Sequence, residues 1–228
     1  MELAIDTSTS IASIALSHKG EVLAEMTWRA GHNHTVDLIP NVDHLLAQCG
    51  LGIENIEALI VAKGPGSFNG LRVGLATAKG LAFSLSVSLV GLSTLEVLAF
   101  PFAQFGLPIC PILQAGRGEI ATALFQMQNG NWTKLIAENV STIDDLCSDT
   151  CERTVFCGEI TSEQIDQLNQ HLGVVAMIPH GAATFRRAGY LAELGWCKIE
   201  AGDFDEPYTL QPLYLKKPSI TKPKRRDP

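Results

Sequence analysis

Two polar turns of this chain carry residue types that can bind phosphate. Asp6-Thr7-Ser8-Thr9 ends the first apolar run, and Gly64-Pro65-Gly66-Ser67 follows a later one. A carboxylate beside hydroxyls can hold metal-bound water and phosphate oxygens, and free amides at a helix start attract anions. A purely structural role for the first turn is an equal alternative, in which the Asp, Thr and Ser side chains close a hairpin by hydrogen bonds to the backbone. The candidate phosphate or nucleotide contacts are Asp6, Thr7, Ser8, Gly64, Gly66 and Ser67.

The helix expected after the second turn has small residues along one face. Pro65 fixes φ and the flanking glycines permit positive φ, so the turn can bend sharply and leave Ser67 to cap the helix. A glycine in a helix costs about 1 kcal/mol relative to alanine, so we expect this face to bind a partner helix at short distance. The alternative is that it packs only against the chain's own sheet. The residues of this face are Gly70, Gly74, Ala78 and Ala82.

Other catalytic patterns fail on spacing. No Gly-Lys-Ser or Gly-Lys-Thr follows the glycines, which excludes a Walker A loop. The six cysteines lack Cys-x-x-Cys spacing, and Cys147, Cys151 and Cys157 have no neighbouring histidine that would complete a zinc site. We therefore expect reduced thiols, no metal and no cofactor.

The composition is that of an ordinary globular protein. With 228 residues, 46% of them hydrophobic, the chain can bury the core of two lobes or two small domains. No run approaches the ~18 apolar residues of a membrane span, and strand-like residues follow Met1 and Glu2 directly, so we expect a cytoplasmic protein without a membrane contact.

The charge is distributed unevenly along the chain. Six basic residues and one aspartate give residues 216–228 a charge of +5, which leaves −12 for the rest. The acidic charge of residues 1–215 is unlike that of a general nucleic-acid-binding protein. The basic segment 216–228 is either a solubilising end or a weak contact for a polyanion.

Strands and helices alternate in the first half of the chain. Period-2 runs, helical periods and turn residues predict the order β-β-β-α-β-α-β-α. This order is typical of a mixed sheet with packed helices, as in one half of the actin-like and ribonuclease-H-like ATPase folds. The predicted strands are 3–6, 11–16, 22–27, 56–62 and 87–90, and the predicted helices are 36–50, the one after residue 67 and one from about 93.

A segment rich in proline and glycine, residues 100–111, marks the boundary between two lobes. We divide the α/β chain into an N-terminal actin-like lobe, 1–104, a second and less regular lobe, 105–216, and a basic tail, 217–228. In the second lobe the predicted strands are 109–114, 119–128 and 154–156, and the predicted helices are 143–146, 162–171 and 182–194.

Five segments, in this order, resemble the TsaB family, also called YeaZ. They are Asp6 to Thr9, the block Gly64 to Arg72, Gly91 to Leu95, Arg117 to Glu119, and Pro212 to Leu215. The family supplies a bacterial subunit of the machinery that makes threonylcarbamoyladenosine in tRNA. The resemblance covers the chain almost to its basic tail and implies a two-lobed actin-like fold. It further implies a non-catalytic subunit that supports the paralogous catalytic subunit TsaD, with the ATPase TsaE as another partner.

One position pair agrees with a non-catalytic role. Catalytic relatives carry His-x-x-x-His after the strand and glycine that correspond to Val90 and Gly91, and here those positions are Thr94 and Leu98. Leucine cannot ligate a metal, and threonine is a poor substitute for imidazole. The resemblance thus implies a scaffold. Its small-faced helix and the helix from His34 to Cys49 would form a helical bundle with TsaD, and the complex would transfer threonylcarbamoyl to the adenosine next to the anticodon. The same surface could instead make a homodimer, and tRNA would be bound indirectly or through the basic tail.

The competing hypothesis is an enzyme, an actin-like ATPase or phosphotransferase with its own nucleotide site. It would use Asp6 for a metal ion and the turn from Gly64 to Gly70 for phosphate, but no convincing second acidic ligand follows in the later half. Two departures from the family pattern affect any site built between the lobes. Gln114 and Gly116 stand where the family has Asp and Arg, and Asn69 stands where it has Thr.

Overall fold

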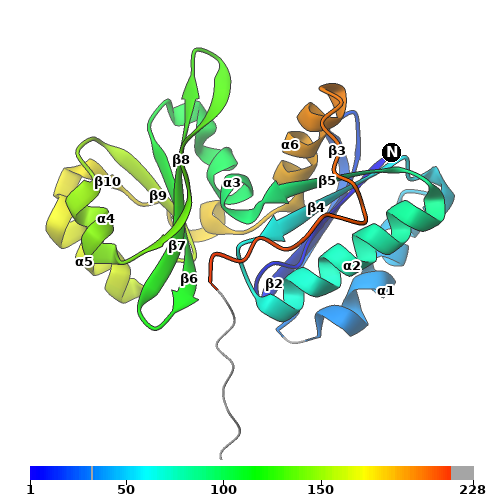
Figure 1. The fold of residues 1–228 in the computed structure, drawn as a ribbon, viewed down its shortest axis with the longest axis horizontal. Helices are drawn as coiled ribbons and strands as arrows, with labels where there is room; N and C mark the ends of the chain where they lie inside the picture. Colours follow the sequence, from blue (N-terminus) through cyan, green and yellow to red (C-terminus); the bar gives the residue numbers. More distant parts are fainter. Residues whose placement is uncertain (32, 217–228) are drawn as a thin grey trace, which may run out of the picture.

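The computed structural model describes residues 1–31 and 33–216, and it shows two lobes that each contain a five-stranded sheet (Figure 1). The predicted basic tail, 217–228, lies outside the described residues. No helix within the described ranges is long and apolar enough to cross a bilayer.

The first sheet has the strand order β3-β2-β1-β4-β5. The first three strands form the predicted antiparallel meander, and β4 and β5 add to it in parallel. All five residues of β1 are buried, because helices cover both faces of the sheet. The strands are β1 Glu2–Asp6, β2 Ile11–His18, β3 Glu21–Arg29, β4 Ala58–Gly64 and β5 Ser88–Ser93.

Helices α1 (His34–Gln48) and α2 (Phe68–Leu85) cover one face of this sheet, and α6 (Ala188–Glu200) covers the other (Figure 1). The short helix α3 (Thr94–Ala99) lies between the lobes, because Val97 packs in the core of the first and Leu95 in that of the second. Short 3₁₀ turns occupy Ile53–Asn55, Phe100–Phe105, Gly173–Val175 and Gly181–Thr184.

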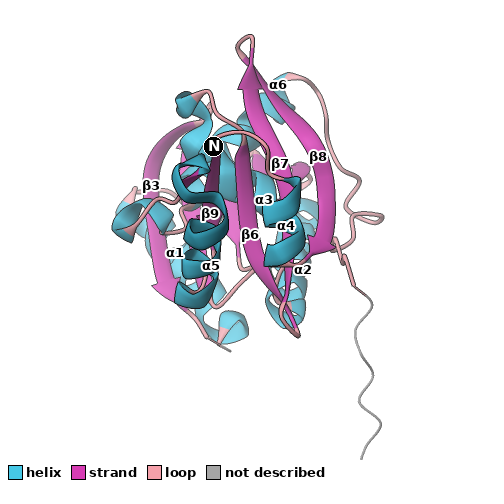
Figure 2. Ribbon diagram, turned by 90° about the vertical axis from the view of Figure 1, so that its left-hand side faces the viewer, coloured by secondary structure: helices cyan, strands magenta, loops and turns pink. Residues whose placement is uncertain are grey.

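The second sheet has the order β10-β9-β6-β7-β8, and its outer face carries α4 and α5 (Figure 2). The predictions missed two edge strands, β8 and β10. Most of β8 is exposed or half-buried and polar, so it lacks the apolar alternation of a core strand. The elements are β6 Ile109–Gly116, β7 Glu119–Gln128, β8 Asn131–Ser141, α4 Ile143–Asp149, β9 Thr154–Gly158, α5 Ser162–Leu172 and β10 Ala176–Met177.

The predicted helix 182–194 is present, but its start is misplaced, and although it falls in the predicted second lobe, 105–216, it packs on the first. The helix begins only at Ala188, because Arg186 and Arg187 are drawn to Asp6 and Glu25 of the first lobe. From there α6 packs on β1, β2 and β4 of the first lobe.

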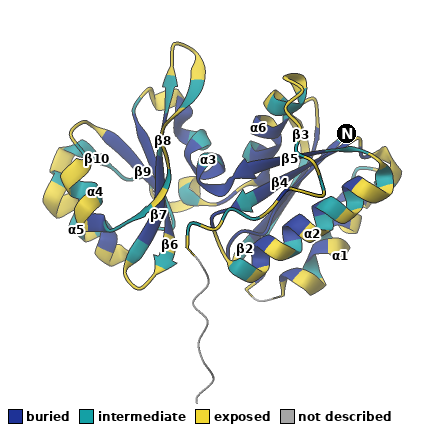
Figure 3. Cartoon of the chain, in the orientation of Figure 1, coloured by how far each residue is buried: buried dark blue, intermediate teal, exposed yellow. Residues whose placement is uncertain are grey.

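Residues 205–216, which we call the C-terminal strap, also run along the first lobe. The backbone amide of Leu213 donates to the carbonyl of Lys63 at 2.7 Å, and Lys79 donates to the carbonyl of Leu210 at 3.1 Å. The central strands and the inner helix faces are buried, while the edge strands β3 and β8 and the outer sides of α1, α2, α4 and α5 are exposed or half-buried (Figure 3).

Candidate functional site

The turn after β1 is closed by an arginine from a distant part of the chain. Arg186 Nη1 lies 3.0 Å from both carboxylate oxygens of Asp6 and also contacts the Ser8 hydroxyl. The Ser8 amide donates to the same carboxylate at 2.9 Å. Asp6 is only 1% exposed, and Thr7 and Ser8 are buried with it. In this arrangement Asp6 is paired with a protein cation, so the predicted phosphate or nucleotide contacts of Asp6, Thr7 and Ser8 would require Arg186 to move away.

The Gly64-Pro65-Gly66-Ser67 turn does admit a close neighbour, but the neighbour is the chain itself. A Cβ on Gly66 would lie 2.1 Å from the carbonyl oxygen of Ser8, and one on Gly64, where φ is +110°, would lie 2.7 Å from that of Leu213. The Ser67 amide, predicted to be free for an anion, donates to the Ser8 carbonyl at 2.6 Å. Ser67 caps α2 as predicted, since its side chain accepts from the amide of Gly70.

The small face of α2 packs against the chain's own sheet. A Cβ on Gly70 would lie 2.1 Å from the carbonyl oxygen of Thr7, and one on Gly74 would lie 2.3 Å from the Thr7 hydroxyl. Ala78 and Ala82 are buried in the same core. The prediction that these four residues bind a partner is wrong for the folded monomer, because no partner helix can reach them. The four-residue spacing of small side chains does mark a close packing face, but that face contacts the β1 turn and the sheet of the same lobe.

The opposite face of α2 and its neighbour α1 are exposed and apolar. Val36 on α1 is 72% exposed and Phe83 on α2 is 67% exposed. Gly80 has open space where a Cβ would project. This second stripe, which also repeats at intervals of three and four residues, was visible in the sequence but was overlooked beside the glycine-rich one. We call it the outer helical face, and it comprises Val36, Ile39, Pro40, Ala76, Gly80 and Phe83.

The positions predicted to have lost a metal pair lie in α3. Thr94 is fully buried and Leu98 nearly so. Between them Glu96 is largely surrounded by protein, and burial raises the pKa of its carboxyl. In the part of the chain that the structure describes, no three His, Cys, Asp or Glu residues group closely enough to hold a metal ion.

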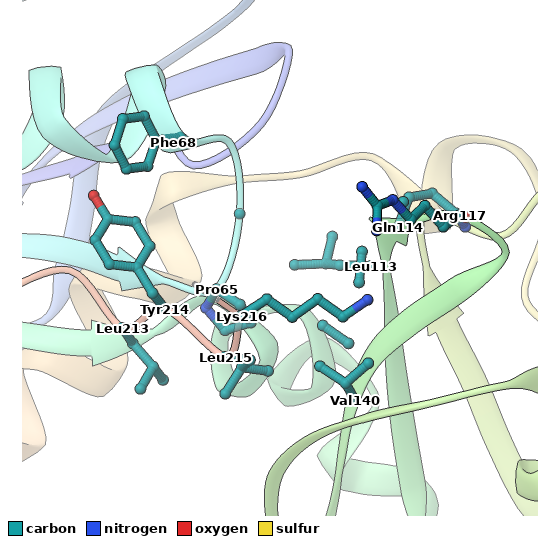
Figure 4. A pocket seen from close by; sticks show the side chains of 14 residues that line it. Pro65, Phe68, Leu113, Gln114, Arg117, Val140, Leu213, Tyr214, Leu215 and Lys216 are labelled. Atoms are coloured by element: carbon teal, nitrogen blue, oxygen red, sulfur yellow. The ribbon is translucent and has the colours of Figure 1, made fainter. Parts of the chain in front are cut away.

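A cavity of about 400 Å³ lies between the lobes, beside the C-terminal strap (Figure 4). Of the predicted phosphate contacts, Gly66 alone lines it. The remaining wall comes from Pro65 and Phe68 at the start of α2, from β6, β7 and β8 with the turn that holds Arg117, and from the strap up to Lys216. Tyr214 holds the strap to the start of α2, since its ring lies 5.3 Å from that of Phe68 and its hydroxyl accepts from Arg72 at 3.3 Å.

Comparison with known proteins places this geometry in a family. The family model described as "TsaD: tRNA N6-adenosine threonylcarbamoyltransferase" matches residues 21–179. A Bacillus subtilis protein named tRNA threonylcarbamoyladenosine biosynthesis protein TsaB is 36% identical, over 94% of this chain and 93% of its own. The Escherichia coli protein of the same name is 35% identical over 57% of each chain.

Solved structures agree on the fold. YeaZ from Pseudomonas aeruginosa superposes with a TM-score of 0.77 at 25% identity, covering 93% of this chain and 99% of that one. The ethanolamine utilization protein EutJ from Carboxydothermus hydrogenoformans, with a TM-score of 0.51 at 13% identity, covers 85% of this chain and 89% of its own and is a likeness of fold alone. The predicted two-lobed, actin-like α/β fold is confirmed, and the chain belongs to the TsaB (YeaZ) family.

Proposed function

We propose that this protein takes part in making threonylcarbamoyladenosine in tRNA, as a non-catalytic subunit that binds a TsaD-type catalytic subunit. The names of its relatives support the pathway. The observation that carries the binding role is the outer helical face, where large apolar side chains of α1 and α2 lie in water. Such a surface on a helix pair is suited to another helix pair.

The residue types on this face favour close helix packing. Ala76 and Gly80 have little or no side chain, so a facing helix can approach the middle of α2 closely. The exposed side chains of Val36 on α1 and Phe83 on α2 would provide apolar contacts to that helix. A paralogous subunit built on the same fold would present a comparable helix pair, and the two would meet in a quasi-symmetric heterodimer. The face therefore replaces the buried glycine stripe as the proposed interface.

A non-catalytic role is supported at two places, the carboxylate that an ATPase would have used and the positions where catalytic relatives carry a histidine pair. Arg186 occupies the carboxylate of Asp6, and the buried threonine and leucine of α3 offer no imidazole pair. An independent ATPase would need Asp6 to release Arg186 before it could hold a metal. Calorimetry with magnesium and ATP tests this point, and binding that Asp6→Asn abolishes would restore the enzyme hypothesis.

Light scattering after size exclusion tests the interface, with the full chain and the TsaD-type subunit of the same organism. Val36→Asp and Gly80→Leu should each weaken the complex at least tenfold, since both disturb an interface core. Both positions are open in the monomer, so thermal stability should stay close to wild type. The matched control is Val174→Asp, at a 91% exposed residue of the second lobe, which should bind normally.

Two results would count against the proposal in different ways. Normal binding by both variants would move the interface away from this face. No complex at all between folded wild-type proteins would remove the scaffold role, and a homodimer mass would indicate self-association on this surface instead.

The finer partner assignments belong to the same proposal. We expect TsaE to join the complex in the cytoplasm, and tRNA to contact it indirectly or through the basic tail. Deleting Pro218 to Pro228 should then weaken tRNA binding and reduce its dependence on salt, because fewer counterions are released. An unchanged salt dependence would leave the tail without a role in tRNA binding.

A further inference from the structure

A second pocket lies on the outer side of the second lobe, beside the short helix α4. Its volume is about 210 Å³, which exceeds the roughly 150 Å³ of a cavity that holds one benzene molecule. Helix α4 has only seven residues, and β8 extends past it (Figure 2), so part of the outer face of β7 and β8 has no covering helix. We call this pocket the α4 pocket. Its wall comes from β6, β7, β8, α4 and the segment 150–154.

Much of the lining of the α4 pocket is apolar. Leu124 on β7 and Ile136 on β8 are cross-strand partners, and Ile136 is 52% exposed. Cys110 is buried, and its sulfur lies 3.0 Å from the Thr122 hydroxyl. Burial raises the pKa of this thiol to about 12, so it is uncharged at neutral pH. A ligand that fills the pocket therefore needs an apolar body, and the apolar lining comprises Pro108, Cys110, Ala123, Leu124, Ile136 and Leu146.

Hydrogen bonds to the main chain hold the segment 150–154 in place. The Thr150 hydroxyl donates to the carbonyl of Leu146 at 2.7 Å, and the Thr154 hydroxyl donates to the carbonyl of Glu152 at 2.8 Å. Each hydroxyl has a single proton, so these bonds leave its oxygen only as an acceptor. The wall is thus fixed before a ligand arrives, which lowers the entropy cost of binding, and it favours a ligand that donates hydrogen bonds.

The charged side chains that line the α4 pocket are acidic. Asp149 and Glu152 line it, and no lysine, arginine or histidine of the described chain does. Neither carboxylate has an ion pair among the described residues. Asp149 is the last residue of α4, where the helix dipole disfavours a carboxylate. Helix stability therefore does not account for this side chain, whereas attraction of a cation to the pocket does.

We propose that the α4 pocket binds a small primary amine whose ammonium group lies against the carboxylates of Asp149 and Glu152. Its apolar body packs on Leu124, Ile136 and Leu146. A primary amine is protonated at neutral pH and then has three donors and no acceptor, which suits carboxylates and hydroxyl oxygens. The second lobe alone forms this pocket, so its occupancy is separate from the outer helical face of the first lobe.

A nuclear magnetic resonance titration of the full ¹⁵N-labelled chain tests the proposal. Phenethylamine and hexylamine share the amine and differ in the body, whereas 2-phenylethanol lacks the charge and methylamine lacks the body. At least one of the two larger amines should shift the amide signals of Thr122, Asn139 and Thr150, with a Kd of about 1 mM. The tighter one assigns the body as aromatic or aliphatic.

The two probes that lack one part should bind more weakly. We expect a loss of about fivefold for 2-phenylethanol, as for an ion pair at a partly exposed rim, and at least tenfold for methylamine. No shift of these amide signals with either larger amine up to about 10 mM would overturn the proposal. Equal affinity for phenethylamine and 2-phenylethanol would overturn the assignment to amines.

Substitutions connect the binding to the two carboxylates. Asp149→Asn and Glu152→Gln should each weaken the tighter amine about threefold, and the double variant about tenfold, while 2-phenylethanol should bind as it does to wild type. Asp166→Asn, at an exposed carboxylate of α5 outside the pocket, is the matched control and should bind normally. Unchanged amine affinity in the double variant, with a melting temperature like that of wild type, would overturn the role of these carboxylates.

Discussion

The glycines of α2 offer a graded test of how this helix packs. Gly70, Gly74 and Gly80 lie in one helix, but a Cβ at each would meet a different neighbour. At Gly70 it would lie 2.1 Å from a backbone oxygen of Thr7, at Gly74 it would lie 2.3 Å from the Thr7 hydroxyl, and at Gly80 it would meet nothing within 4 Å. Alanine at the three positions should therefore change stability in three different ways.

The expected free energies follow from these contacts. Alanine gains up to about 1 kcal/mol over glycine in a helix. At Gly70 the backbone oxygen must move, at a cost on the order of 3 kcal/mol, so the net loss is about 2 kcal/mol. At Gly74 the Thr7 hydroxyl can rotate away but loses its 2.7 Å bond to the Gly70 carbonyl, which costs about 1 kcal/mol and nearly cancels the gain. At Gly80 only the gain remains.

Thermal unfolding followed by circular dichroism measures the series. For a chain of this size, 1 kcal/mol shifts Tm by roughly 2–4 °C. Gly70→Ala should lower Tm by about 4–8 °C, Gly74→Ala should change it little, and Gly80→Ala should raise it by about 2 °C. For the same reason Gly74→Leu, which adds a much larger side chain at this contact, should destabilise the monomer itself.

The order of the melting temperatures of the three alanine variants tests whether the small face of α2 is packed on the β1 turn. If Gly70→Ala were as stable as Gly80→Ala, the small face would not be packed on the β1 turn, and its availability to a partner would have to be reconsidered. Equal destabilisation at all three positions would instead indicate a general intolerance of α2 and would refute the argument from local contacts.

Three further predictions rest on buried groups. Arg186→Met should cost about 3–5 kcal/mol of unfolding free energy in denaturant titration, since it leaves the Asp6 carboxylate buried without its cation, and Asp6→Asn in the same chain should recover part of that loss; a mild effect would contradict the closed turn. Burial raises the pKa of Glu96 above 4.5 in the folded state, so this group's contribution to stability falls as pH rises from 4.5 through the folded pKa. Glu96→Gln should therefore raise Tm more at pH 8 than at pH 4, and an equal gain at both would contradict this reasoning. Burial raises the pKa of Cys110 to about 12, so a thiol reagent at pH 8 should label exposed Cys151 in the native protein and Cys110 only after unfolding, as peptide mass mapping would show.

Much of the fold is local enough to be predicted from the sequence. Alternation of apolar residues gave the meander of β1 to β3, the helical period gave α1, and Ser67 was recognised as the cap of α2. The edge strand β8 was missed because partial exposure on both sides removes the alternation that marks a core strand. The start of α6 was misplaced because its boundary depends on contacts of Arg186 and Arg187 with the other end of the chain.

The site depended far more on tertiary structure. The sequence by itself determined that α2 has a small face, that polar turns follow β1 and β4, and that the chain resembles the TsaB family. It did not determine which neighbour covers that face, that Arg186 pairs with Asp6 across 180 positions, or that strands, turn and strap enclose one cavity. Periodicity reports the spacing of residues along one element, whereas contact, burial and charge pairing depend on elements brought together from distant parts of the chain.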